Sequence, residues 1–295
     1  MSPIRHVLVH INDPVRSRAV LHLGAAIARR HRAEVTALLA IPPIARGAFL
    51  NAETASLARD LYLDQLSKLR AASEDFVAAA AAEHDCTIGL SVAEDDPLDA
   101  LKAHARTSDL LLVGQRAEGE SGGLGPVESG RLLLGAGCPV LFVPHIGWQP
   151  AEDGQVLQSV LVAWSGTRES ARAMRDAMPL LAAARRVELV CLVHHDTPDS
   201  PDKGLNAVVA HLRRHGVDPA VSVQRSHAPA LGERMRRGWI PDAPVAETLE
   251  SHAADVRADL IVMGGYGHAR VWEIVLGGVT RTMLQSMTVP VLMSH

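Results

Sequence analysis

Short aliphatic runs alternate along the second half of the chain with longer segments in which apolar residues recur at helical spacing. The runs are nearly continuous, which is typical of strands buried on both faces of a parallel sheet. Strands are predicted at 156–163, 187–193, 220–224, 259–263 and 289–293, and helices at 168–184, 202–215, 245–256 and 278–286. Such alternation predicts a doubly wound, Rossmann-like α/β domain with a five-stranded parallel sheet.

The first half of the chain repeats this pattern. Four blocks match in the same order at offsets of 148 to 153 residues: 7–9 with 160–162, 101–105 with 249–253, 109–114 with 259–264, and 139–141 with 290–292. A repeated block order at a nearly constant offset indicates two copies of one domain. We therefore expect domains at 1–145 and 156–295, joined by a linker rich in Pro, Gly, Asp and Gln.

Composition indicates an ordinary globular protein and argues against several other classes. Of 295 residues, 47% are hydrophobic and 21% charged, as in ordinary globular domains, and aromatic residues make up only 3%, so the core must be aliphatic. The net charge of −4 argues against a general electrostatic attraction to nucleic acid or anionic lipid. The three cysteines lack disulfide or metal-site spacing, and no apolar run is long enough for a membrane span. A cytoplasmic setting is expected.

The segment after the predicted strand 259–263 carries the strongest chemical signal. Its glycines follow the pattern Gly-x2-Gly-x9-Gly-Gly, at Gly264, Gly267, Gly277 and Gly278. Glycines at a strand end let the backbone approach a ligand, and the free N–H groups at the start of the next helix favour phosphate. His268 and Arg270 add positive charge. The alternative is that the glycines only form a tight turn and a close-packed helix start.

At this segment the sequence resembles the universal stress protein family in its tandem two-domain form, over essentially the whole chain. ATP-binding members hold the nucleotide with Gly-x2-Gly-x9-Gly-Ser/Thr after the fourth strand and with residues at the ends of the first two strands. The resemblance implies binding residues at Ala163, Ser165, Leu192, Val193, Met263, Gly264, Gly267, His268, Gly277, Gly278, Val279 and Thr280.

Two of these positions depart from the family pattern. Gly278 stands where the family has Ser or Thr, so a hydroxyl donor to phosphate is lost, and Thr280 is a candidate to replace it. Ser165 stands where the family has an Asp that faces the adenosine. A second interpretation of Ser165 is that a small polar residue suits the start of the following helix.

The first copy has lost the glycine pattern. At an offset of 150 residues, Ala117 replaces Gly267, while Val127 and Glu128 replace the last two glycines. A carboxylate near a helix start suits the helix dipole but repels phosphate. We expect the first copy to bind no triphosphate and to serve as a structural or regulatory partner.

The resemblance implies a stress-response protein that binds ATP or a related adenine nucleotide in its C-terminal domain, alone or with Mg²⁺, and acts as a sensor or binding module. No general base or acidic Mg²⁺ pair stands out, so any hydrolysis should be slow. Two alternatives stay open: an interaction protein that binds no nucleotide, and a slow ATP-hydrolysing enzyme of the nucleotide-alpha hydrolase type. An unidentified protein partner is expected, and neither nucleic acid nor membrane.

The two copies are expected to pack as an intramolecular pseudo-dimer. Single-domain members of the family pair through the last strand, and covering that edge also prevents aggregation. Residues 138–143 and 289–293 should therefore pair, and a homodimer of whole chains remains open. Elsewhere, His211 and His215 stand four residues apart on a predicted helix, a spacing that can hold a metal, but the arginines between them favour a solvated basic face.

Overall fold

The computed structural model describes residues 3–43, 52–117, 123–148, 155–194, 204–226, 243–266 and 278–295. The first copy contains β1 (His6–Ile11), α1 (Arg18–His31), β2 (Glu34–Ala40), α2 (Ala52–His84), β3 (Ile88–Ala93), α3 (Pro97–Ala105), β4 (Leu110–Gly114), α4 (Pro126–Gly135) and β5 (Val140–Val143). Its strands are parallel in the order β3-β2-β1-β4-β5.

The second copy repeats this arrangement. It contains β6 (Ser159–Trp164), α5 (Arg168–Asp176), α6 (Met178–Ala183), β7 (Arg186–His194), α7 (Leu205–Arg214), β8 (Ala220–Ser226), α9 (Ala243–Asp255), β9 (Leu260–Gly264), α10 (Gly278–Ser286) and β10 (Val291–Ser294). The parallel order is β10-β9-β6-β7-β8. The predicted α/β fold, with two doubly wound five-stranded domains, is confirmed.

Two local differences from the predicted elements have clear causes. The predicted helix 168–184 is two helices, because Pro179 lies in the first turn of α6 and has no N–H to continue the hydrogen bonding of α5. The strand predicted from residue 156 begins at Ser159, because Leu157 takes a left-handed backbone conformation with φ 51°. Leu157 is nevertheless buried, which explains its apolar character.

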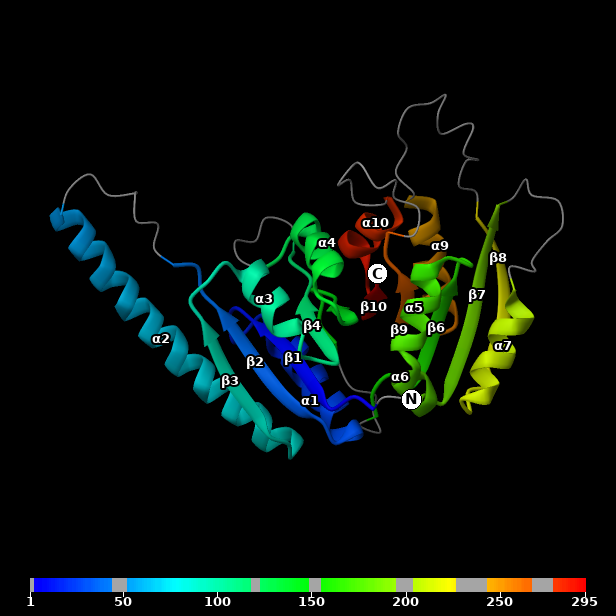
Figure 1. The fold of residues 1–295 in the computed structure, drawn as a ribbon, viewed down its shortest axis with the longest axis horizontal. Coiled ribbons are helices and arrows are strands. Elements are labelled where there is room, and N and C mark those ends of the chain that lie inside the picture. The colour runs from blue at the N-terminus through cyan, green and yellow to red at the C-terminus, as the bar shows by residue number, and fades with distance from the viewer. Residues whose placement is uncertain are drawn as a thin grey trace, which may run out of the picture.

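The two copies join edge to edge into one ten-stranded sheet (Figure 1). The junction is the antiparallel pair β5 and β10, in which Leu141 lies opposite Leu292. This is the pairing of last strands that the sequence predicted, and it makes the molecule a pseudo-dimer. Side chains reinforce the junction: the Gln115 amide donates to the carbonyls of Leu284 and Gln285 at 3.1 and 2.9 Å.

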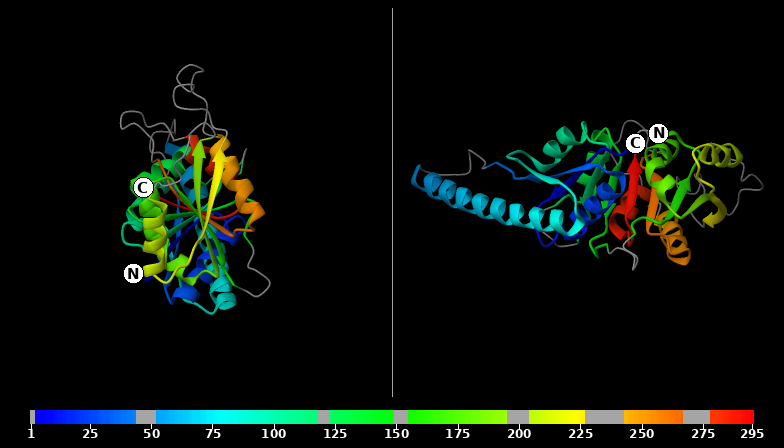
Figure 2. Two further views of the ribbon diagram at one scale, coloured as in Figure 1. Left: turned by 90° about the vertical axis from the view of Figure 1, so that its right-hand side faces the viewer. Right: turned by 90° about the horizontal axis from the view of Figure 1, so that it is seen from below.

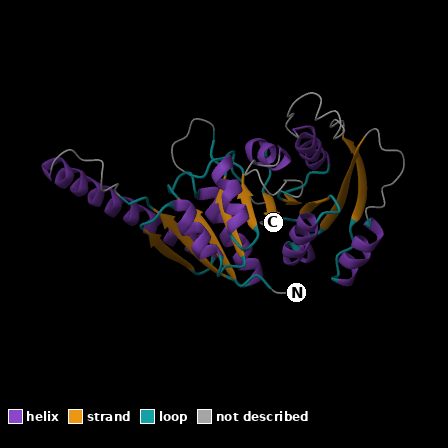
Figure 3. Cartoon of the chain, turned by 45° about the horizontal axis from the view of Figure 1, so that its top comes forward, coloured by secondary structure: helices purple, strands orange, loops and turns teal. Residues whose placement is uncertain are grey.

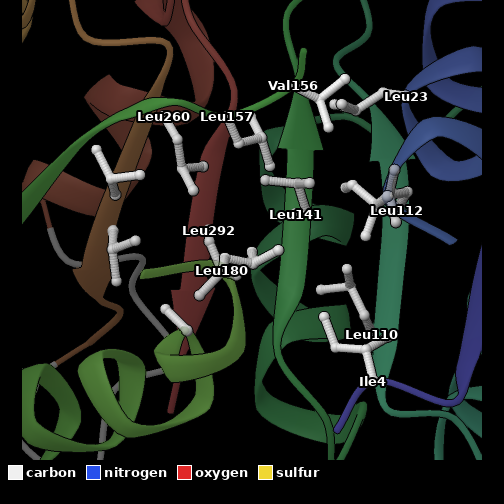
Figure 4. Close-up of a cluster of buried hydrophobic side chains, with 14 of the residues drawn as sticks. Ile4, Leu23, Leu110, Leu112, Leu141, Val156, Leu157, Leu180, Leu260 and Leu292 are labelled. Atoms are coloured by element: carbon white, nitrogen blue, oxygen red, sulfur yellow. The ribbon is translucent and has the colours of Figure 1, made fainter. Parts of the chain in front are cut away.

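Helices cover both faces of the sheet (Figures 2 and 3). Alternate strand residues enter opposite cores: Leu110 and Leu112 belong to one apolar cluster, and Leu111 and Val113 to the other. Each cluster contains residues of both copies, and Figure 4 shows aliphatic side chains of one cluster around β4, β5 and β10. The pseudo-dimer therefore shares a continuous core. None of the described helices is both long and apolar enough to cross a membrane.

Candidate functional site

The candidate site lies where β6 and β9 end side by side in the second copy. β6 pairs with β7 on one side and with β9 on the other, so the direction of winding reverses between β6 and β9. Ligands of doubly wound sheets bind beyond the carboxyl ends of the strands at such a switch point. The predicted residues Ala163 and Met263 lie near these two ends, on neighbouring strands.

Apolar side chains lie at this edge of the sheet. Ala163, Leu192 and Val279 are partly buried and pack against the cluster that contains Met263. Tyr266 packs against the same cluster. Four residues that the resemblance implied, from three strands and a helix, thus belong to or pack against the same apolar cluster. Val193 follows on β7, paired with Arg225 of β8.

The turn after β6 is a polar helix cap. The Thr167 hydroxyl accepts from the N–H of Ser170 at 3.3 Å, and the Ser170 hydroxyl accepts from the N–H of Thr167 at 3.2 Å. This reciprocal pair is a capping box. Ser165 lies 2.9 Å from Thr167, hydroxyl to hydroxyl, and remains exposed. Ser165 thus contributes to the helix start while its side chain stays open to solvent.

Gly264 lies against the first turn of α5. A β-carbon at this position would lie 2.5 Å from the carbonyl carbon of Glu169 and 2.5 Å from the nitrogen of Ser170. Real β-carbons do not approach backbone atoms so closely, and the packed backbone cannot easily move. The close helix packing alone therefore requires glycine here, whatever else the position does.

Glu169 places a carboxylate beside this contact. Its side chain is largely buried and forms an ion pair with Arg168 at 3.0 Å. Burial acts to raise the pKa of Glu169, but a hydrogen bond from its own N–H, together with the hydrogen bond and positive charge of Arg168, holds the pKa below its ordinary value. The carboxylate is therefore ionised at neutral pH and its charge is compensated by Arg168.

The segment after β9 is fastened to the elements around it. The N–H of Gly265 donates to the carbonyl of Ser294 at 2.9 Å, and the N–H of Tyr266 donates to the Thr280 hydroxyl at 3.3 Å. Tyr266 takes a left-handed conformation with φ 64°, and its ring meets that of His295 edge to face, with centroids 6.0 Å apart. Burial raises the pKa of Tyr266 to about 12, so its hydroxyl stays protonated.

Helix α10 begins at Gly278 with a first turn that contains no acidic residue. Gly278 and Thr280 are buried, and the Thr280 oxygen already accepts the bond from Tyr266. A hydroxyl in that position keeps its own hydrogen for a second partner. Three residues that the sequence pointed to, Gly267, His268 and Gly277, lie outside the described residues.

The corresponding helix start in the first copy is built differently. Pro126 is the first residue of α4 and brings no N–H, and Glu128 lies in the same first turn. A β-carbon on Gly125 would meet the Arg116 guanidinium and would lie 2.7 Å from the Glu128 carboxylate, so both side chains lie over the start of the helix. In the first copy, the negative charge at this helix start is therefore the chain's own Glu128 carboxylate, and the Arg116 guanidinium lies beside it.

The comparison with known proteins places the chain in a family. The model of the universal stress protein family matches residues 3–144 and again residues 157–295. The chain belongs to the universal stress protein family. A search of curated proteins found no match.

Solved structures of universal stress proteins are similar to this chain, and the first of them shares its fold over nearly the whole length. A universal stress protein from Archaeoglobus fulgidus DSM 4304 is 15% identical with a TM-score of 0.71, and the match covers 98% of this chain and 97% of that one. UspA from Lactobacillus plantarum is 16% identical over 48% of this chain and 99% of its own, with a TM-score of 0.41. A universal stress protein in complex with cAMP is 23% identical over 48% and 98%, with a TM-score of 0.34.

The two domains of this universal stress protein are offset by a variable number of residues. β4 and β9 differ by 150, but the last turns of α4 and α10 carry equivalent hydrogen bonds, Ala136 to Leu132 and Met287 to Met283, at an offset of 151. The first residues of the two helices, Pro126 and Gly278, differ by 152. A constant offset therefore does not hold through these helices, and the pairing of the last two glycines with Val127 and Glu128 stays a prediction.

His10 distinguishes the first domain at the strand end that corresponds to Ala163. It is 6% exposed, and burial lowers its pKa to about 4, so the imidazole is neutral at pH 7. The comparison of the two sequence repeats did not single out His10, although the match of residues 7–9 with 160–162 makes His10 the equivalent of Ala163. Nor did it find Glu169, which lies against Gly264 of β9, or Tyr266, which is hydrogen-bonded to Thr280 of α10.

Proposed function

We propose that this universal stress protein binds an adenine nucleotide, with ATP as the favoured ligand, in its second domain and acts as a sensor or binding module. The observation that carries the proposal is the position of α10. The helix begins at Gly278 directly after the Gly-x2-Gly-x9-Gly segment, and that segment leaves β9 at the switch point of the sheet. A helix N-terminus whose described first turn carries no acidic residue favours phosphate in this place.

The other residues suit a nucleoside. The partly buried surface of Ala163, Leu192 and Val279 would support the adenine ring, because apolar surface stabilises a stacked or packed base. The exposed hydroxyl of Ser165 is the polar group nearest in sequence to the end of β6 and would face the ribose. Gly267, His268 and Gly277 would complete the phosphate side.

Magnesium would be held by the nucleotide more than by the protein. Mg²⁺ prefers carboxylate and phosphate oxygens and keeps several waters. Among the described residues of the site, the carboxylate beside Gly264 is that of Glu169, and Arg168 already pairs with it. Because an ionised, paired carboxylate is also a poor general base, hydrolysis would be slow.

Two observations favour an alternative in which the chain binds no nucleotide. Gly264 is explained by the packing of α5, and the Thr280 hydroxyl already accepts a hydrogen bond from Tyr266. Both residues would then be structural, and the protein would act through its surface alone.

Analysis of released small molecules separates the two functions. The full-length chain is purified without added nucleotide and denatured, and the supernatant is examined by mass spectrometry. Titration of the same chain with ATP and with adenosine is followed by calorimetry. The proposal predicts an adenine nucleotide in the supernatant or saturable ATP binding at one site per chain. An empty supernatant together with no binding heat would support the interaction protein.

A further inference from the structure

Three ligand-type side chains converge between α1 and α2 of the first domain, away from the proposed nucleotide site. His22 comes from α1, and Glu83 and His84 come from the last turn of α2. The His22 Nδ1 lies 3.0 Å from the His84 Nε2 and 3.3 Å from a Glu83 carboxylate oxygen. All three atoms lie within 4.8 Å of one another. Such convergence is the geometry that a cation requires.

Two of the three separations are close to those of a tetrahedral site. In a tetrahedron with zinc–nitrogen bonds of about 2.0–2.1 Å, neighbouring ligand atoms are about 3.3 Å apart. The two separations that involve His22, 3.0 and 3.3 Å, lie close to this value, and the third is no more than 4.8 Å. The imidazole rings are inclined by 77° and are therefore not stacked on each other.

A single Nδ1 of His22 faces both the His84 nitrogen and the Glu83 oxygen, but one ring nitrogen carries either one proton or one lone pair. His22 can therefore form a full hydrogen bond with only one of these two partners at a time. A cation bound by the three atoms would engage the lone pairs of both imidazoles and of the carboxylate at once.

We propose that His22, Glu83 and His84 form a binding site for a divalent transition metal of the zinc class. Two imidazoles and one carboxylate are ligands that Zn²⁺ takes in proteins, and water would complete the coordination. The site would fasten the end of α2 to α1. It is independent of the proposed nucleotide binding, because it lies in the other domain.

The surroundings keep the ligands ready and accessible. The His22 side chain is 15% exposed and that of Glu83 is 57% exposed, so an ion can reach the cluster from solvent. Arg29 is a positively charged group that opposes a cation here, and the Glu83 carboxylate compensates for it.

A second histidine pair provides a matched control. His211 on α7 and His215, the residue that caps its C-terminus, also lie ring to ring, with centroids 4.8 Å apart, against 4.9 Å for His22 and His84. Among the described residues, no carboxylate or cysteine joins the α7 pair as a third ligand. His211→Ala therefore removes an imidazole from a similar pair without touching the proposed site.

The test titrates the metal-free, tag-free full-length chain with Zn²⁺ by calorimetry. Wild type and His211→Ala should each bind one ion per chain at the proposed site with equal affinity. His22→Ala and His84→Ala should weaken that binding by more than about tenfold, a loss that even removal of a supporting outer-shell group can cause. Glu83→Gln, a conservative change of an exposed side chain, should weaken it without affecting the fold.

Two further measurements keep the result interpretable. Circular dichroism establishes that each variant is folded, and Co²⁺ in place of Zn²⁺ should give the visible absorption of a tetrahedral ion in wild type and His211→Ala only. The proposal is overturned if wild type binds no Zn²⁺ under these conditions. It is also overturned if folded Glu83→Gln and both histidine variants bind like wild type, since binding would then be scattered over other histidines.

Discussion

At Gly264, β9 and the first turn of α5 approach so closely that a β-carbon has no room. Gly264→Ala should therefore lower the free energy of unfolding by about 1–3 kcal/mol, the usual cost of overpacking. Urea denaturation measures this. Gly89→Ala is the control, because the nearest atom to its β-carbon would be 3.9 Å away, and it should cost little. Equal stability of Gly264→Ala and wild type would mean that α5 is not packed as described.

The substitution Gly278→Ser tests whether the hydroxyl that the family carries at this position would bind phosphate. If phosphates lie at the start of α10, Gly278→Ser adds a donor there, and ATP affinity should rise several-fold, equivalent to about 1 kcal/mol. Adenosine has no phosphate, so its affinity should not change. Calorimetry with both ligands compares the two effects. A fall in ATP affinity, or an equal change for adenosine, would place the phosphates elsewhere.

His10 links stability to pH. Its pKa in the folded protein is about 4, against 6.5 when unfolded, so the unfolded chain binds the extra proton first as pH falls. Stability should therefore decrease from about pH 6.5 to pH 4, by roughly 3 kcal/mol from this residue. His10→Leu should lose less stability over that range than wild type in urea titrations at several pH values. Parallel losses would show that His10 is not buried in its neutral form.

At the scale of elements, continuous aliphatic runs predicted the strands of the second domain because a doubly covered parallel strand must be apolar throughout. The division of helix 168–184 was visible in principle at Pro179, whereas the left-handed Leu157 had no local signal. The glycine pattern indicated where the site lies. It could not distinguish packing from binding at Gly264, because that depends on how closely α5 approaches.

Polar side chains connect α9 to β7 and β8. A His252 nitrogen lies 2.6 Å from the Glu188 carboxylate, and its other ring nitrogen lies 3.2 Å from the Gln224 amide. Both side chains of the His252–Glu188 pair are 13% exposed. His252→Ala leaves a largely buried carboxylate without this partner and should cost about 2–3 kcal/mol.

Chemical denaturation of single and double variants checks this prediction. Glu188→Leu combined with His252→Leu removes both polar groups and should cost less than His252→Ala, since no buried charge loses its partner. If His252→Ala unfolds at the same denaturant concentration as wild type, the pair contributes nothing and α9 is held by its apolar face alone.

At the scale of the molecule, the sequence repeat predicted the two domains, and the resemblance to the family implied that they join through their last strands. The β5–β10 pair removes an open edge from each five-stranded sheet, leaving β3 and β8 at the ends. Duplication within one chain also frees one domain to change. The first domain carries Pro126, Glu128 and Arg116 at the helix start where the second carries Gly278. We infer that nucleotide binding is confined to the second domain.

The most direct test compares one substitution in each domain by titration with ATP. Gly277→Glu places a carboxylate and a side chain where the phosphates should lie, and Val127→Glu places the same side chain at the exposed start of α4. Calorimetry should show that wild type and Val127→Glu bind one ATP per chain with the same affinity, while folded Gly277→Glu does not bind. Equal affinity in Gly277→Glu and wild type, or equal losses in both variants, would contradict nucleotide binding at α10.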